Sequence, residues 1–311
     1  MLRHGHHVDQ CITISPDLGK SQEVAGYLDL REPLDHRQIP LHTCNTYALK
    51  EDQDGDSIRS LGMDILFVIG WQRLIPDWFL TELRLGAFGM HGSSLPLPHG
   101  RGRSPMNWSL VQGRDLFYTH LFKYKPGVDD GDIAGVQCFD ITPFDTCLTM
   151  HYKNTMAMIS LVDRLLPSLC SDTAMLQAQS EDGATYYPKR SREDGLIDWT
   201  ASTTTIHNLI RAVTAPFPGA FTHLDNKDEF QLNIWKAIPF DEQMVFPDSR
   251  PGEIIQQFES GDFVVQTGSS SLLVTEWEMT SGPTPKHLTG RMLGNAGRSI
   301  KDWGTLPRPQ A

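Results

Sequence analysis

A histidine and an aspartate lie where apolar stretches of the sequence give way to glycine-rich segments. His91 follows the stretch GAFGM, and Asp129 lies in PGVDDGD, just before another apolar stretch. In open α/β sheets the carboxyl ends of the strands form the active crevice, so both side chains are candidates for one site. A carboxylate that orients an imidazole makes a general-base pair. The residues alone also fit a structural histidine and, for Asp129, turn formation or helix capping.

Two arginines lie farther along the same segment as the histidine. Arg101 and Arg103 are separated by one glycine, and their guanidinium groups could hold a phosphate or a carboxylate. Solvated charges on an exposed loop are the alternative, and the residues alone leave both interpretations open. No comparable signal predicts a metal site, because the five cysteines form no CxxC pair. We therefore expect free thiols and no bound metal.

Most of these candidates fall in residues 89–105, GMHGSSLPLPHGRGRSP. The prolines exclude a helix and a central strand because they lack a backbone donor, and the glycines make any regular element entropically costly. We therefore expect a long, ordered loop. In compact domains such loops are usually functional.

The elements that must position this loop alternate between strands and helices. Strands are expected at 8–15, 63–70, 86–91, 117–124 and 133–141, and helices at 76–85, 104–113 and 146–169. This pattern predicts an α/β fold with a Rossmann-like, mostly parallel sheet. Such domains usually begin with a strand, whereas this chain opens in what reads as the end of a helix. We therefore expect the first strand of the sheet to be missing from the chain.

Composition changes along the chain predict two domains and a tail. Residues 1–185 form the Rossmann-like domain, and the polar stretch 171–193 reads as a linker. Residues 194–285 contain a short helix and then short strands separated by turns, which is typical of a small OB-like β-barrel. The glycine- and proline-rich residues 286–311 predict an irregular tail.

The overall composition is that of a globular protein. Of the 311 residues, 39% are hydrophobic and 21% are charged. No apolar run reaches the roughly eighteen residues that a membrane span needs, and the chain does not open with a signal-peptide pattern. We therefore expect no membrane association and a cytoplasmic location. The net charge of −11 argues against nucleic acid as a partner, because phosphate neutralisation needs a basic surface.

Two blocks of the sequence, in the order in which they occur, resemble the folate-dependent formyltransferases. They are GAFGMHGSSLPLPHGRGRSPMNWSLVQG (86–113) and GVDDGDIAG (127–135). The family pattern is roughly N-x-H-x-S-L-L-P, R-G-x-x-P-x-x-W and D-x-G-D/A-I. The residues EDGLIDW (193–199) and IHNLIRAVTAPFPGAFT (206–222) also resemble the start of the family's C-terminal barrel. The family includes sugar-nucleotide and methionyl-tRNA formyltransferases, and the motifs are most similar to the formyltransferase domain that acts on UDP-4-amino-arabinose.

The resemblance implies an enzyme that transfers a formyl group from 10-formyltetrahydrofolate to the amine of an amino-sugar nucleotide in surface-glycan biosynthesis. His91 and Asp129 correspond to the family's catalytic histidine and aspartate. By the same correspondence the formyl donor would be bound by Arg73, Leu74, Ile75, Arg103, Lys125, Pro126, Gly127, Val128 and Asp129. Candidate residues for the amino-sugar nucleotide are Ser93, Arg101, Arg103 and Asn107. No metal takes part.

Two departures from the family pattern bear on activity. Gly89 stands where the family has an asparagine that helps to hold the formyl oxygen, and losing one such donor costs roughly 10²–10³ in rate. The loop between His91 and the Arg-Gly pair is two residues longer than the pattern. Candidates to replace the missing donor are Ser93, Ser94, Asn107 and a backbone N–H.

Three other functions stay open. A methionyl-tRNA formyltransferase needs a surface for tRNA, which the net charge of −11 and the lack of an evident basic insertion in 16–60 disfavour. A non-catalytic relative that binds folate or nucleotide would be consistent with Gly89. A formylation domain that acts on peptides or other amines is the third. The residues do not identify the amino sugar or the nucleotide, and by analogy with relatives that dimerise, a homodimer is the oligomeric state to test.

Overall fold

The computed structural model describes residues 5–24, 26–244 and 246–300. Residues 1–4 of the predicted first domain and 301–311 of the predicted tail lie outside the described residues. The chain forms two compact units, each built from several segments. The first comprises Met1–His91, Thr119–Gln137 and Met156–Asp182, and the second Gly92–Tyr118, Cys138–Thr155 and Gly183–Ala311. The domain boundaries expected from the sequence, 1–185, 194–285 and 286–311, stay predictions.

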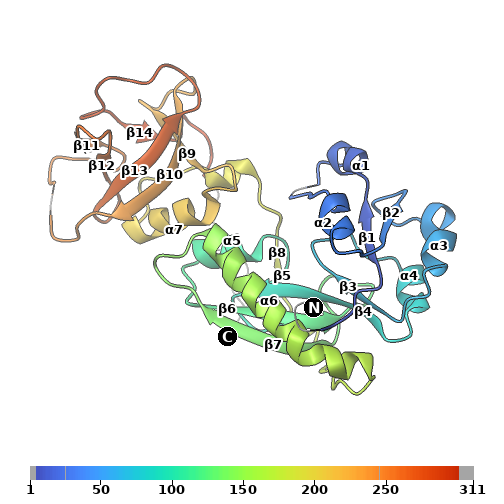
Figure 1. Ribbon diagram of the computed structural model, residues 1–311. Helices are drawn as coiled ribbons and strands as arrows, with labels where there is room; N and C mark the ends of the chain where they lie inside the picture. The colour runs from blue at the N-terminus through green and yellow to red at the C-terminus, as the bar shows by residue number, and fades with distance from the viewer. Residues whose placement is uncertain (1–4, 25, 245, 301–311) are drawn as a thin grey trace. The chain divides into compact units, whose positions relative to one another are not determined.

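Strands and helices alternate along the first part of the chain (Figure 1). They are β1 (Cys11–Ile14), α1 (Pro16–Ser21), α2 (Arg31–Asp35), β2 (Leu41–Cys44), α3 (Glu51–Arg59), β3 (Ile65–Val68), α4 (Asp77–Glu82), β4 (Gly86–Ser93), β5 (Arg101–Gly102), α5 (Pro105–Val111), β6 (Leu116–Lys123), β7 (Ile133–Asp140) and α6 (Cys147–Cys170). Every strand and helix predicted between 63 and 169 is present, and only its ends differ. The short helices α1, α2 and α3 have no counterpart in the sequence prediction.

Four strands form one sheet in the order β3-β4-β6-β7. β3 and β4 are parallel, with Ile65 opposite Gly86. β6 runs in the opposite direction, because Phe117 at its start packs beside Gly92 and Lys123 at its end packs beside Gly86. The predicted α/β class is confirmed, and the sheet is mixed where β6 enters it.

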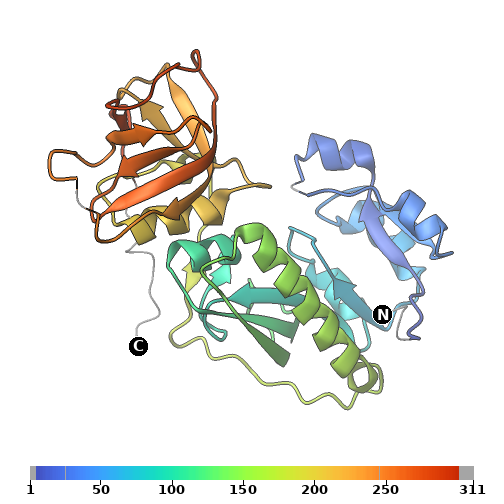
Figure 2. The same ribbon diagram turned by 60° about the vertical axis from the view of Figure 1, so that its left-hand side comes forward.

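Helix α6 lies across this sheet (Figures 1 and 2). Its Leu161 is fully buried against Phe88 of β4 and Leu121 of β6. Gly135 of β7 permits the close approach, since a Cβ there would lie 2.6 Å from the side chain of Leu165. Although α6 is long, no helix of the described residues is apolar enough over a sufficient length to cross a membrane.

The first two strands make a separate parallel pair. Cys11 lies opposite Leu41, and Ile14 lies opposite Cys44. Among the described residues this pair forms its own sheet and is not hydrogen-bonded into the four-stranded one. The expected loss of a first strand stays a prediction.

The last third of the chain is a small β domain. Its elements are β8 (Tyr186–Tyr187), the 3₁₀ turn η2 (Arg192–Gly195), α7 (Thr203–Val213), β9 (Ala220–Leu224), β10 (Gln231–Pro239), β11 (Ile254–Gln257), β12 (Phe263–Gln266), β13 (Ser271–Met279) and β14 (Leu293–Gly294). Six strands pair antiparallel in the order β11-β12-β13-β10-β9-β14. An isolated bridge between Glu253 and Met292 brings together the residues that precede the two edge strands, β11 and β14. The sheet therefore curves towards a barrel, although β11 and β14 themselves are not paired.

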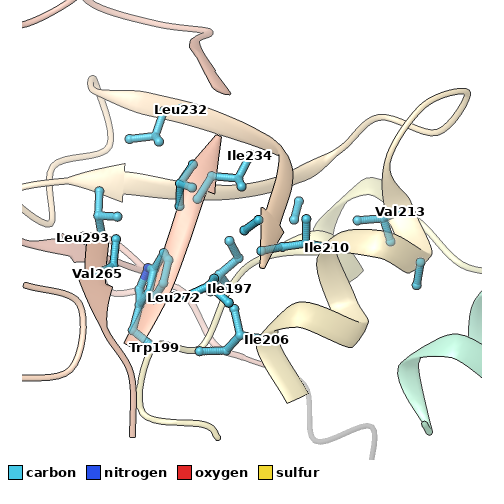
Figure 3. Close-up of a cluster of buried hydrophobic side chains, with 14 of the residues drawn as sticks. Ile197, Trp199, Ile206, Ile210, Val213, Leu232, Ile234, Val265, Leu272 and Leu293 are labelled. Atoms are coloured by element: carbon cyan, nitrogen blue, oxygen red, sulfur yellow. The ribbon is translucent and has the colours of Figure 1, made fainter. Parts of the chain in front are cut away.

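Helix α7 closes the core of this barrel (Figure 3). Its Ile206 and Ile210 are buried together with Ile234 of β10 and Val265 of β12. The apolar residues of α7 recur at helical spacing, so one face of the helix is buried as the sequence pattern predicts. The predicted C-terminal β-barrel is confirmed as a six-stranded antiparallel half-barrel.

Three segments differ from the sequence interpretation. β4 continues to Ser93, so the first residues of the expected loop 89–105 belong to a strand. The ring of Phe117 packs against Gly92 of this strand, where a Cβ would collide with it. The segment 171–193, expected to be a linker, contributes β8, which pairs in parallel with β5. Residues 293–294 of the expected irregular tail form β14, which pairs with β9. In the last two cases the polar or glycine-rich composition of the segment predicted no strand, although the segment contains a few apolar side chains.

Candidate active site

Strand β4 carries the strongest catalytic candidate. Positions 89, 91 and 93 share one face, because side chains two positions apart in a strand point the same way. Only 8% of the His91 side chain is exposed, and its Nδ1 lies 3.3 Å from Oδ2 of Asp129. The structure thus brings together two residues that lie in separate segments of the sequence. A buried imidazole beside a carboxylate is suited to proton transfer.

The hairpin between β6 and β7 presents Asp129. Its φ of +52° lies in the left-handed region, which aspartate tolerates better than most residues. Gly131 lets the hairpin close, since a Cβ there would collide with the carbonyl oxygen of Lys123. Gln179 holds the turn through its Nε2, which donates to the carbonyl oxygens of Asp129 at 2.9 Å and Gly131 at 2.6 Å. The direction of the Asp129 carboxylate is therefore set by the backbone around it.

Tyr124, directly after β6, fills the space beside Gly89. Its backbone N–H donates to the carbonyl oxygen of Ala87 at 2.8 Å. A Cβ at position 89 would lie 2.5 Å from the Tyr124 hydroxyl oxygen, so no larger residue fits unless the ring moves. Burial, and then the negative charge of Asp129, raise the pKa of Tyr124 to about 12. The hydroxyl therefore keeps its proton at neutral pH.

Two segments expected to bind the formyl donor follow β3 and β6. In the first, the guanidinium of Arg73 lies over the ring of Tyr47, 5.2 Å from its centroid. Leu74 exposes 58% of its surface, and Ile75 is buried beneath it in the chain's core. Val128 of the second segment is 43% exposed. Exposed apolar side chains on such loops suit a ligand that carries an aromatic ring.

The second of these segments also carries charge. Lys125, Pro126 and Gly127 are exposed, and Nζ of Lys125 lies 2.7 Å from Oδ1 of Asp132. A side chain at Gly127 would collide with the carboxylate of Asp130, so the turn is tightly folded. The aspartates of this hairpin do not make a metal centre: over the described residues, no three His, Cys, Asp or Glu side chains gather as metal ligands would.

Two of the residues expected to bind the acceptor are engaged inside the protein. Arg101 is fully buried, and its Nη1 donates to the Tyr186 hydroxyl at 2.9 Å. Asn107 is buried in α5, where its Nδ2 donates to the carbonyl oxygen of Ala212 at 2.6 Å. These contacts give both side chains a structural role, which the sequence motif alone does not reveal.

The other two acceptor candidates, Ser93 and Arg103, differ in exposure, and Ser94 is described with them as a candidate for the missing donor. Ser93 is buried, and its hydroxyl accepts from the backbone N–H of Leu95 at 3.4 Å. Ser94 is also buried, with its hydroxyl 3.4 Å from that of Tyr187. Arg103 is exposed, so among these residues it is the one whose charge faces solvent.

Sequence reasoning missed Tyr124, Gln179 and the segment around β8. The backbone N–H of Arg101 donates to the Thr185 carbonyl at 2.9 Å, and Nε1 of Trp108 donates to the Pro188 carbonyl at 3.0 Å. These residues act through contacts between distant parts of the chain, and no local pattern marks them. The one available signal was Gly89, whose missing side chain implies a neighbour close to the strand.

Models of two protein domains match the chain. The formyl transferase model matches residues 24–159, and the model of the formyl transferase C-terminal domain matches residues 189–286. The two matches cover both halves of the fold described above, in the expected order.

Three of the solved structures with the same fold come from different proteins. HypX from Aquifex aeolicus in complex with tetrahydrofolic acid has a TM-score of 0.62 at 17% identity, over 89% of this chain and 45% of HypX, so the chain spans about half the length of HypX. An N-formyltransferase from Helicobacter canadensis, solved with folinic acid and dTDP-3-aminofucose, has a TM-score of 0.56 at 14% identity, over 88% of this chain and 100% of that one. Methionyl-tRNA formyltransferase from Clostridium thermocellum has a TM-score of 0.55 at 16% identity, over 87% and 98%. At these identities the likeness shows the fold.

Proposed function

Since the chain belongs to the formyl transferase family, we propose that it transfers the formyl group of 10-formyltetrahydrofolate to the primary amine of an amino-sugar nucleotide. The observation that carries this proposal is the pair of the buried His91 and the partly buried Asp129, with Nδ1 and Oδ2 3.3 Å apart, on the strand and hairpin where the sequence motifs fall. Formyl transfer to an amine needs a base for the amine proton and an acid for the departing nitrogen, and one imidazole can serve as both.

His91 moves the proton in this proposal. The Asp129 carboxylate accepts a hydrogen bond from Nδ1–H of His91, so that proton stays on Nδ1 and the unprotonated Nε2 is the base. The amine nitrogen bonds to the formyl carbon, whose π electrons move onto oxygen, and Nε2 takes the proton that the nitrogen loses. The electron pair on oxygen then re-forms the C=O bond as the bond from carbon to N10 breaks. N10 keeps the electron pair of that bond, and His91 returns the proton to it. The products are an N-formyl amine and tetrahydrofolate, and no oxidant, reductant or metal is consumed.

The formyl donor would lie along the two exposed segments of the site. Leu74 and Val128 offer apolar surface for the pterin ring, and Arg73 and Lys125 offer positive charge for the carboxylates of the folate tail. Ile75 and the tight turn at Gly127 would shape this surface from below. The roles of these residues and of Arg103 belong to the proposal.

An amino-sugar nucleotide is the acceptor class favoured here. The relative from Helicobacter canadensis, solved with such a compound, matches this chain over its whole length. The exposed Arg103 could contact a diphosphate, whereas the net charge of −11 disfavours tRNA. A cytoplasmic location and a role in surface-glycan synthesis are part of the same proposal, and a homodimer is the assembly to test.

An acceptor panel tests this proposal. The protein is incubated with 10-formyltetrahydrofolate and UDP-, dTDP-, GDP- or CMP-linked amino sugars, or with methionyl-tRNA, and N-formyl product is measured by mass spectrometry. We expect product with at least one sugar nucleotide and none with methionyl-tRNA. Product with methionyl-tRNA alone would show that tRNA, and not a sugar nucleotide, is the acceptor. Folate binding without any product would show that the protein is a non-catalytic relative.

A further inference from the structure

We propose that Tyr124 is a catalytic residue whose hydroxyl donates a hydrogen bond to the formyl oxygen as that oxygen becomes negative. The proposal rests on the formyl transfer proposed above and adds a residue to its site. It also answers the question raised by Gly89: the side chain absent from position 89 is replaced in space by a side chain from the neighbouring strand.

The position of the Tyr124 hydroxyl follows from the pairing of two strands. Tyr124 is anchored opposite Ala87 by the hydrogen bond from its N–H, and its ring reaches along β4 to Gly89. Gly89 and His91 are two positions apart on the same face of β4, a separation of about 7 Å along the strand. The hydroxyl therefore lies one side-chain position before the imidazole, on the face where the proposed reaction takes place.

The surroundings of the ring keep its hydroxyl fixed and protonated. The ring packs against Phe122, with centroids 5.2 Å apart. Desolvation and the charge of Asp129 disfavour the phenolate, so the hydroxyl keeps a proton to donate across the neutral range. Among the described residues, no protein group is hydrogen-bonded to this hydroxyl, which leaves its proton available to a ligand.

Asp129 connects Tyr124 with the proton-transfer pair. Its carboxylate lies against His91 and also raises the pKa of Tyr124, so the three side chains share one electrostatic environment. Formyl transfer creates a positive charge on the amine nitrogen and a negative charge on the formyl oxygen, and a different side chain serves each. His91 serves the nitrogen proton, and Tyr124 serves the oxygen. A preorganised donor aimed at a developing oxyanion is often the largest single contribution to catalysis.

Gly89 is the condition for this arrangement. Any Cβ at position 89 would displace the tyrosine ring, so a side-chain donor from position 89 and a hydroxyl from Tyr124 exclude each other. The two positions should therefore be exchangeable. Replacing the ring by a small residue makes room at position 89 for a side chain with its own N–H donor.

The test uses Tyr124→Phe, which removes only the hydroxyl, and Tyr152→Phe on the exposed surface of α6 as the matched control. We expect Tyr124→Phe to lower kcat for formyl transfer roughly a hundredfold with little change in KM or melting temperature, and the control to behave as wild type. The double variant Gly89→Asn with Tyr124→Ala should recover part of the rate that Tyr124→Ala alone loses. Unchanged kcat in Tyr124→Phe would overturn the proposal.

A binding measurement separates this proposal from that of the acceptor. Calorimetry compares tetrahydrofolate with a dideaza analogue that carries the formyl group at N10, in wild type and in Tyr124→Phe. We expect wild type to favour the formylated ligand by a factor of roughly three to ten, and Tyr124→Phe to lose this preference while it binds tetrahydrofolate normally. If wild type shows the preference but formylates no sugar, the acceptor assignment fails and Tyr124 keeps its role. If neither folate binds, both proposals fall.

Discussion

At the scale of single residues, the site depends on side chains whose direction is set by their neighbours. His91 and Asp129 are predicted from the sequence because they match the family motifs, whereas their place beside apolar stretches alone leaves a structural role open. Tyr124 and Gln179 are not, because their importance arises from what lies beside them after folding. Gln179 donates two hydrogen bonds to the backbone of the Asp129 hairpin, so we assign it a positioning role.

Gln179→Ala tests that role. The variant loses both hydrogen bonds to the hairpin, so Asp129 should hold His91 less well. We expect kcat to fall roughly tenfold, and the pH profile of kcat to shift, because the imidazole would no longer be tuned by a fixed carboxylate. Steady-state assays across pH measure both effects. Gln243→Ala, in an exposed loop of the β domain, is the control, and a Gln179→Ala profile that superimposes on wild type would count against the assignment.

At the scale of elements, the sequence predicts whether a segment is a strand or a helix better than it predicts where that element begins and ends. The apolar strands and α6 are found where their patterns place them, because burial on one or both faces leaves a clear periodic signal. The two errors that matter lie at 171–193 and 286–311, where β8 and β14 are two-residue strands held mainly by pairing to distant partners. Such short strands carry no periodicity, so one sequence cannot reveal them. For the same reason the burial of Arg101 and Asn107 was not foreseen.

Asn107→Ala distinguishes a structural from a substrate-binding role at the contact of α5 with α7. The buried Nδ2–carbonyl hydrogen bond to Ala212 would be lost, and the carbonyl would be left without this partner. We expect a loss of about 1–3 kcal/mol in unfolding free energy by chemical denaturation, with KM for the acceptor unchanged. Normal stability together with a raised KM would instead support the substrate contact that the family motif implies.

Gly131→Ala tests the hairpin that presents Asp129. A Cβ at this position would collide with the backbone carbonyl of Lys123, which cannot move as a side chain can. We expect a lower melting temperature and a loss of activity larger than that of Gln179→Ala. Gly261→Ala provides the comparison, because its Cβ would meet nothing within 4 Å and any effect there must come from its positive φ. Equal activity in Gly131→Ala and wild type would show that the hairpin adapts.

At the scale of the whole molecule, a half-buried histidine of α7 links stability to pH. Burial, and then the charge of Arg211, lower the pKa of His207 to about 4 from its ordinary 6.5. The unfolded chain therefore binds this proton first, and stability should be full above pH 6.5 and decrease as the pH falls towards 4. Denaturation at pH 7.5 and pH 5 should show a smaller loss in His207→Gln than in wild type. Equal losses would contradict the assignment of this pH dependence to His207.

The central claim is that the His91–Asp129 pair moves the proton during formyl transfer, and single-turnover transfer by His91→Ala tests it most directly. The variant and wild type are mixed with 10-formyltetrahydrofolate and the acceptor found in the panel, with and without added imidazole. We predict that His91→Ala is slower by roughly 10²–10⁴, that it binds the donor as wild type does, and that imidazole restores part of the rate. Transfer by His91→Ala at the wild-type rate would contradict the account.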